Sequence, residues 1–138
     1  SIPATLHITH SWGGGVAQWL KSFIAADTGH CHYQLRSESP QSNGSYGQRL
    51  ALYAANELRR PVASWWLKPA IGSIVESHAG YREVIEEICR RFSIGRVFVS
   101  SLVGHSLDAL RTGLPTLQVF TSIQELDEYL DAMQKAAR

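Results

Sequence analysis

The chain has 138 residues, which suits one domain that buries roughly two thirds of the surface of the unfolded chain. Hydrophobic residues make up 44% and charged residues 18%, a globular rather than a disordered composition. The net charge of +1 gives no electrostatic reason to expect a nucleic acid as partner. Because there is no apolar run of about 20 residues, no signal-peptide pattern and only two scattered cysteines, we expect a cytoplasmic protein without a membrane span.

The first third of the chain alternates between strand and helix patterns. Residues 4–10 predict a short apolar strand, and residues 30–38 predict a second one. Between them, apolar residues recur at the spacing of one helix face, at Val16, Trp19, Leu20, Phe23 and Ile24. This helix is expected to end near Asp27, with Gly29 just beyond it.

The middle third is the most ambiguous part of the chain. Residues 39–48 are rich in Ser, Gly, Asn and Pro and predict a loop. Residues 49–56 and 61–68 resemble strands that form either a hairpin or two separate strands, and the Ala-rich first run is also compatible with a helix. In a strand, the adjacent residues Trp65 and Trp66 face opposite ways.

The last third returns to regular alternation. A helix, a buried strand, a short helix, another strand and a final helix are predicted over residues 81–92, 95–103, 105–113, 115–120 and 121–138. Gly113 is expected to stop the short helix, and Ser122 with Glu125 forms a capping box at the start of the final one. Strands that alternate with helices predict a single α/β domain over residues 1–138. We expect a doubly wound, mostly parallel sheet of about five strands with helices on both faces.

The stretch "HSWGGGV" follows the first predicted strand. Gly13, Gly14 and Gly15 allow a close approach of the backbone, and a helix that begins near Val16 presents unpaired N–H groups to an anion. The stretch matches neither the dinucleotide pattern G-x-G-x-x-G nor the P-loop pattern, which requires a lysine. A phosphate-facing loop and a purely structural turn both remain open.

Two other patterns suggest chemistry and are weaker. "VGHSLDAL" resembles a hydrolase nucleophile elbow at Ser106, but Asp108 stands where a small residue is needed and no histidine follows that serine. We therefore reject the hydrolase. His30 and His32 share one face of a strand and would suit a metal, but with no third ligand at a typical spacing we expect edge-strand polar residues and no metal site.

Three stretches together resemble a known family. "LHITHSWGGGVAQWL", "YQLRSE" and "GRVFVSSLVGHSLDALRTGLPTLQVF" are similar to the amino-terminal Rossmann-like domain of GT-B fold glycosyltransferases of the family 4-like type. The resemblance covers about residues 5–120. It implies a domain that mainly holds the sugar or glycan acceptor, while a second, carboxyl-terminal domain carries most of the nucleotide-sugar site.

The resemblance also implies roles for particular residues. Gly13, Gly14, Gly15 and Val16 would face the donor diphosphate across a cleft between the two domains, with no cofactor required. His10, Ser11, Trp12, His105 and Ser106 would lie at the acceptor side or edge of that cleft.

The chain departs from the family in two respects. The final helix, residues 121–138, stands where a His-Asp pair and aromatic residues are expected, and the chain does not contain the second domain. We therefore expect the chain alone to be inactive as a transferase. Two alternatives stay open: a non-catalytic or recombined Rossmann-like scaffold, and a stand-alone phosphate- or nucleotide-binding module.

Overall fold

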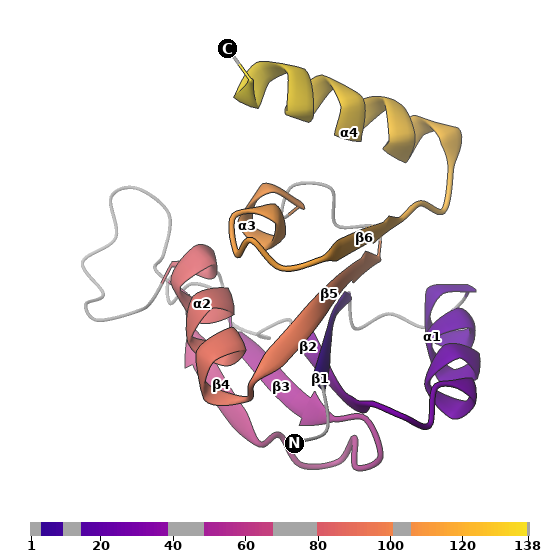
Figure 1. Ribbon diagram of the computed structural model, residues 1–138, viewed down its shortest axis with the longest axis vertical. Helices are drawn as coiled ribbons and strands as arrows, with labels where there is room; N and C mark the ends of the chain where they lie inside the picture. The colour runs from indigo at the N-terminus through magenta and orange to yellow at the C-terminus, as the bar shows by residue number, and fades with distance from the viewer. Residues whose placement is uncertain (1–3, 10–14, 39–48, 68–79, 101–105, 138) are drawn as a thin grey trace.

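The computed structural model describes residues 4–9, 15–38, 49–67, 80–100 and 106–137. These residues form ten elements (Figure 1), in chain order β1 (Ala4–Thr9), α1 (Gly15–Ala26), β2 (Cys31–Glu38), β3 (Arg49–Ala54), β4 (Ala63–Trp66), α2 (Tyr81–Arg91), β5 (Ile94–Ser100), α3 (Ser106–Leu110), β6 (Thr116–Val119) and α4 (Ile123–Ala136). The alternation predicted from the sequence is confirmed, and the protein is an α/β domain.

The sheet has six strands in the order β4-β3-β2-β1-β5-β6. β1 pairs in parallel with β2 and β5, and β5 pairs in parallel with β6. β3 pairs antiparallel with both β2 and β4. The expected five or so strands therefore become six in a mixed sheet. The short connection over residues 55–62 explains the β3–β4 hairpin, because a parallel pairing needs a crossover of a dozen residues or more. A helix over residues 49–56 is wrong.

Helices cover both faces of the sheet, as expected (Figure 1). α2 and α3 pack on one face, and α1 packs on the other. The fully buried core on the α2 side is aliphatic: Val84, Ile85 and Ile88 of α2 are buried against strand residues such as Leu6 and Val97, with partly buried aromatic rings at its margin. This stripe at helical spacing explains why the segment is a helix and which face it buries.

The α1 side of the same strands is polar and aromatic. Alternation along each strand places one set of buried polar residues beneath α1, namely Thr5, His7, Thr9, His32, Gln34 and Ser100. Phe23 of α1 packs on the ring of Phe98, with 5.0 Å between the ring centroids. Trp19, one turn earlier in α1, stacks on Phe23 with 5.5 Å between centroids. Trp19 is thus a packing residue, as the sequence predicts.

α4 has the predicted cap but little packing. Ser122 Oγ accepts a hydrogen bond from the backbone N–H of Glu125 at 3.2 Å, and the Glu125 carboxylate accepts from Thr121. α4 has no buried residue, and Ile123 of its apolar stripe is 79% exposed. Tyr129 contacts Phe120 edge-on, and Figure 1 shows α4 standing beyond α3 and β6. The cap defines this helix more than tertiary contacts do.

Candidate functional site

The strand order reverses direction at β1. Its neighbour in the sheet is β2 on one side and β5 on the other. The chain leaves β1 toward α1 on one face of the sheet, and it leaves β5 toward α3 on the opposite face. In open α/β sheets, ligands bind beyond the carboxyl ends of the strands at such a reversal. α1, which begins at Gly15, therefore follows the strand at whose carboxyl end a ligand is expected.

Several of the predicted site residues, His10, Ser11, Trp12, Gly13, Gly14 and His105, lie outside the described residues. Gly15 and Val16 are the first two residues of α1. The other end of α1 is tied by Asp27 to Arg96 near the beginning of β5, so α1 runs back across the sheet and begins at the carboxyl edge. The N–H groups of its first turn have no acceptor within the helix and supply partial positive charge there.

Ser106 begins α3 directly after the β5 connection. Its side chain is buried, and Oγ donates to Gln118 Oε1 on β6 at 2.6 Å. The hydroxyl thus links α3 to β6. The Ser106 hydroxyl is thus engaged by an amide rather than by a histidine.

Polar side chains that sequence reasoning missed lie just behind this edge. Gln34 Nε2 donates to Thr9 Oγ1 at 2.8 Å, joining β2 to the last residue of β1. Ser100 ends β5 and is fully buried, and its Oγ has no hydrogen-bond partner among the described residues. Polar residues at the ends of apolar strands were the available signal.

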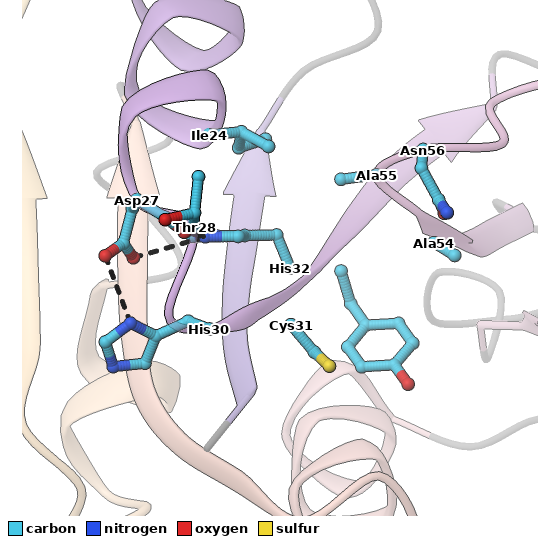
Figure 2. Close-up of a pocket in the computed structure, with 10 residues that line it drawn as sticks. Ile24, Asp27, Thr28, His30, Cys31, His32, Ala54, Ala55 and Asn56 are labelled. Carbon is cyan, nitrogen blue, oxygen red and sulfur yellow. Dashed lines mark hydrogen bonds and ion pairs between the residues drawn. The ribbon is translucent and has the colours of Figure 1, made fainter. Parts of the chain in front are cut away.

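A second cluster lies at the opposite end of α1, around Asp27 (Figure 2). His30 Nδ1 is 3.1 Å from Asp27 Oδ1, and His32 Nε2 is 3.2 Å from Oδ2. Arg96 forms an ion pair with the same carboxylate and donates from Nε to Thr5 Oγ1 at 2.5 Å. Figure 2 shows both histidines turned toward the carboxylate. Burial raises the pKa of Asp27, but the His30 hydrogen bond and the Arg96 charge outweigh it, so the pKa lies below its usual value.

The cluster continues inward to His7. His7 Nε2 is 2.9 Å from His32 Nδ1, and both rings are buried. Because His32 Nε2 faces only acceptors on Asp27, a neutral His32 carries its proton there and accepts at Nδ1. His7 then donates from Nε2, which leaves its Nδ1 buried without a partner among the described residues. Burial above all, then the charges of His32 and Arg96, lowers the pKa of His7 to about 3.

This arrangement favours a structural clamp over a metal centre. The described residues contain no group of three or more His, Cys, Asp or Glu side chains able to hold a metal ion. The edge-strand position expected for His30 and His32 is wrong, because His32 lies in β2, which is between β1 and β3, and His30 lies just before that strand. A pocket of about 360 Å³ lies beside the cluster, between Ile24, His32 and Ala55. The clamp fixes the end of α1, and through it the position of the helix start at the carboxyl edge.

No family model, curated protein or solved structure matches the chain. The likeness to glycosyltransferases therefore stays a prediction from the sequence motifs.

Within the part of the chain that the structure describes, no helix combines the length and apolarity needed to cross a bilayer. Cys31 is an exposed free thiol, and Cys89 is a half-buried one.

Proposed function

We propose that the chain is the acceptor-side, Rossmann-like domain of a glycosyltransferase that works with a nucleotide-sugar site on a second domain. One observation supports the proposal: α1, which begins at Gly15, the last of the three glycines, is the helix that follows β1, and the strand order reverses at β1. Diphosphates suit this position, because a helix start and a glycine turn offer N–H donors without a lysine. The three family-like sequence stretches support the choice of sugar transfer.

The proposed chemistry uses the start of α1 in a defined way. When a nucleotide-sugar gives up its sugar, negative charge grows on the leaving diphosphate. The first-turn N–H groups of Gly15 and Val16 would stabilise that charge, as fixed dipoles do in other group transfers. His10, Ser11, Trp12 and His105 would border the acceptor side, while Ser106 supports α3 through Gln118.

The test is an amide-resolved NMR titration of the ¹⁵N-labelled chain with UDP-glucose, UDP, uridine and inorganic pyrophosphate. We expect UDP-glucose and UDP at millimolar concentration to shift the amides of residues 13–16, and uridine to leave them unchanged. Pyrophosphate that binds as tightly as UDP would favour the stand-alone phosphate-binding module instead. No shift with any diphosphate would favour the inactive scaffold and remove the proposal.

A matched pair of glycine variants locates the binding. Gly14→Asp adds a carboxylate in the glycine loop and is expected to abolish the UDP-dependent shifts by charge repulsion. Gly29→Asp adds the same charge after α1, at the opposite edge, where a new Cβ would meet nothing within 4 Å. The proposal requires that Gly29→Asp retain the response of the unaltered chain.

A further inference from the structure

A second pocket on the α1 side has the character of an anion site. It encloses about 450 Å³ between α1 and the β2–β3 side of the sheet, within the size range of small-molecule sites. Apolar side chains, among them Leu20, Ile24 and Leu58, form much of its wall. Two cations and one amide complete it, namely Lys21, Arg36 and Gln34. The described residues that line it include no carboxylate.

Arg36 is held in place by two neighbouring side chains. Its Nη2 donates to Gln34 Oε1 at 3.1 Å, and Gln34 in turn donates to Thr9. The guanidinium lies over the ring of Tyr53, 5.1 Å from the centroid. Its Nε is buried and has no acceptor among the described residues. The fork geometry is therefore set before any ligand arrives, which reduces the ordering that binding would require.

The two cations of the pocket have no ion-pair partner among the side chains that the structure describes. No described carboxylate forms an ion pair with Arg36 or with Lys21, whereas Arg96 on the same face is neutralised by Asp27. A partly buried guanidinium prefers a carboxylate or phosphate that accepts more than one of its N–H groups. The apolar walls would in addition take up a hydrocarbon body.

We propose that this pocket binds a small organic anion with an apolar body, its carboxylate or phosphate contacting Arg36 and Lys21. The carboxylate and the phosphate share one chemistry, that of an oxyanion on a hydrocarbon. The site goes beyond the proposed sugar transfer, because it rests on residues of α1, β2 and the β3–β4 connection rather than on the glycine loop.

The experiment uses four probes that separate charge from apolarity: hexanoate, hexyl phosphate, neutral 1-hexanol and inorganic phosphate. NMR titration follows the Arg36 Nε–H, the Gln34 side-chain amide and the backbone amide of Ala25. We expect at least one of the two hexyl anions to bind at least about tenfold more tightly than both hexanol and inorganic phosphate, a gap of about 1.4 kcal/mol. Which hexyl anion binds more tightly identifies the preferred head group.

Variants then assign the contact. Arg36→Gln removes the charge and is expected to lower the affinity for the preferred hexyl anion at least tenfold. Lys21→Gln should lower this affinity several-fold, and Arg36→Lys should restore part of the affinity lost in Arg36→Gln. Arg82→Gln is the matched control, because Arg82 is an exposed cation of α2 that pairs with Glu86.

Any of three results would overturn the proposal. These are hexanol binding as tightly as the hexyl anions, an unchanged affinity of Arg36→Gln for the preferred anion, and the absence of a saturable NMR shift with any probe. If Arg36→Gln fails to fold, Lys21→Gln and the hexanoate–hexanol comparison on the unaltered chain still decide. UDP shifts at residues 15–16 that persist in Arg36→Gln would leave the glycosyltransferase proposal standing on its own.

Discussion

The two faces of the sheet differ in chemistry although both are buried. Along β1, Leu6 and Ile8 face α2 and α3, while Thr5, His7 and Thr9 face α1. Buried aliphatic side chains stabilise the folded state in almost any close-packed arrangement. Polar side chains must also find partners in fixed directions, so they tolerate few positions of the covering helix. The α2 side thus supplies stability, and the α1 side fixes where one helix lies.

The polar face also leaves part of its hydrogen-bonding capacity unused. The three buried side-chain atoms without a partner among the described residues are His7 Nδ1, Arg36 Nε and Ser100 Oγ, and all three belong to the α1 side. Each such atom is costly, since a buried donor or acceptor that loses its partner forfeits about 1–3 kcal/mol. Departures from the most stable arrangement are expected at functional sites, and the proposed anion pocket lies on this face.

The largest effect is expected on the aliphatic face. Leu6 has no exposed surface, so Leu6→Ala removes buried methyl groups and leaves a cavity. We expect the free energy of unfolding to fall by about 3 kcal/mol, as for other fully buried leucines. Urea denaturation followed by circular dichroism measures it. A loss below about 1 kcal/mol would contradict the assignment of stability to this face.

The polar face should respond to pH where the aliphatic face does not. The pKa of His7 is about 3 in the folded protein and 6.5 ordinarily, so between these values the unfolded chain binds the extra proton. The free energy of unfolding therefore falls as the pH is lowered through this window, by up to about 1.4 kcal/mol per pH unit from this group.

His7→Gln tests this dependence, because the Gln amide can still donate toward His32 Nδ1 but does not titrate. We expect a shallower decline of stability between pH 6.5 and 4 in this variant, measured by urea denaturation at half-unit steps. Leu6→Ala is the control, and it should lower stability at every pH while keeping the slope of the unaltered chain. Equal slopes in all three proteins would show that His7 is not the group responsible.

A smaller effect is expected where the polar face approaches the carboxyl edge. Thr9→Val leaves the buried Gln34 amide without its acceptor and should cost about 1–3 kcal/mol. Gln34→Leu and the double variant complete a thermodynamic cycle. The double variant should lose less than the sum of the single losses, since the two side chains are partners. Additive losses in urea denaturation would mean that the bond contributes nothing to stability.

The sequence was informative where structure depends on neighbours along the chain. The helical spacing that ends near Asp27 predicted α1, and Ser122 with Glu125 predicted the start of α4. Gly113, expected to stop the short helix, follows the end of α3 at Leu110 by three residues and has a φ of 74°. Trp66 is 44% exposed while Trp65 packs on the core, as alternation required. Each of these features is set by periodicity or by a single hydrogen bond.

The candidate sites could be predicted only in part, because their partners are far apart in sequence. Asp27 and Arg96 are 69 positions apart, and His7 and His32 are 25 apart. Their meeting depends on the pairing of β1 with both β2 and β5, and no local pattern encodes that register. Arg96, in the otherwise apolar strand β5, was a signal that an acceptor or a carboxylate had to lie nearby.

The smallest effect is expected in α4, which covers neither face of the sheet within the described residues. Ile123→Ser replaces a residue that is 79% exposed, in a helix without buried residues. We expect the free energy of unfolding to change by less than about 0.5 kcal/mol, as for surface substitutions elsewhere. Ser122→Ala, which removes the side-chain acceptor for the Glu125 N–H, should instead lower the helix content measured by circular dichroism. A loss of 2 kcal/mol or more for Ile123→Ser would mean that α4 packs against the domain in solution, and that its apolar stripe belongs to the core.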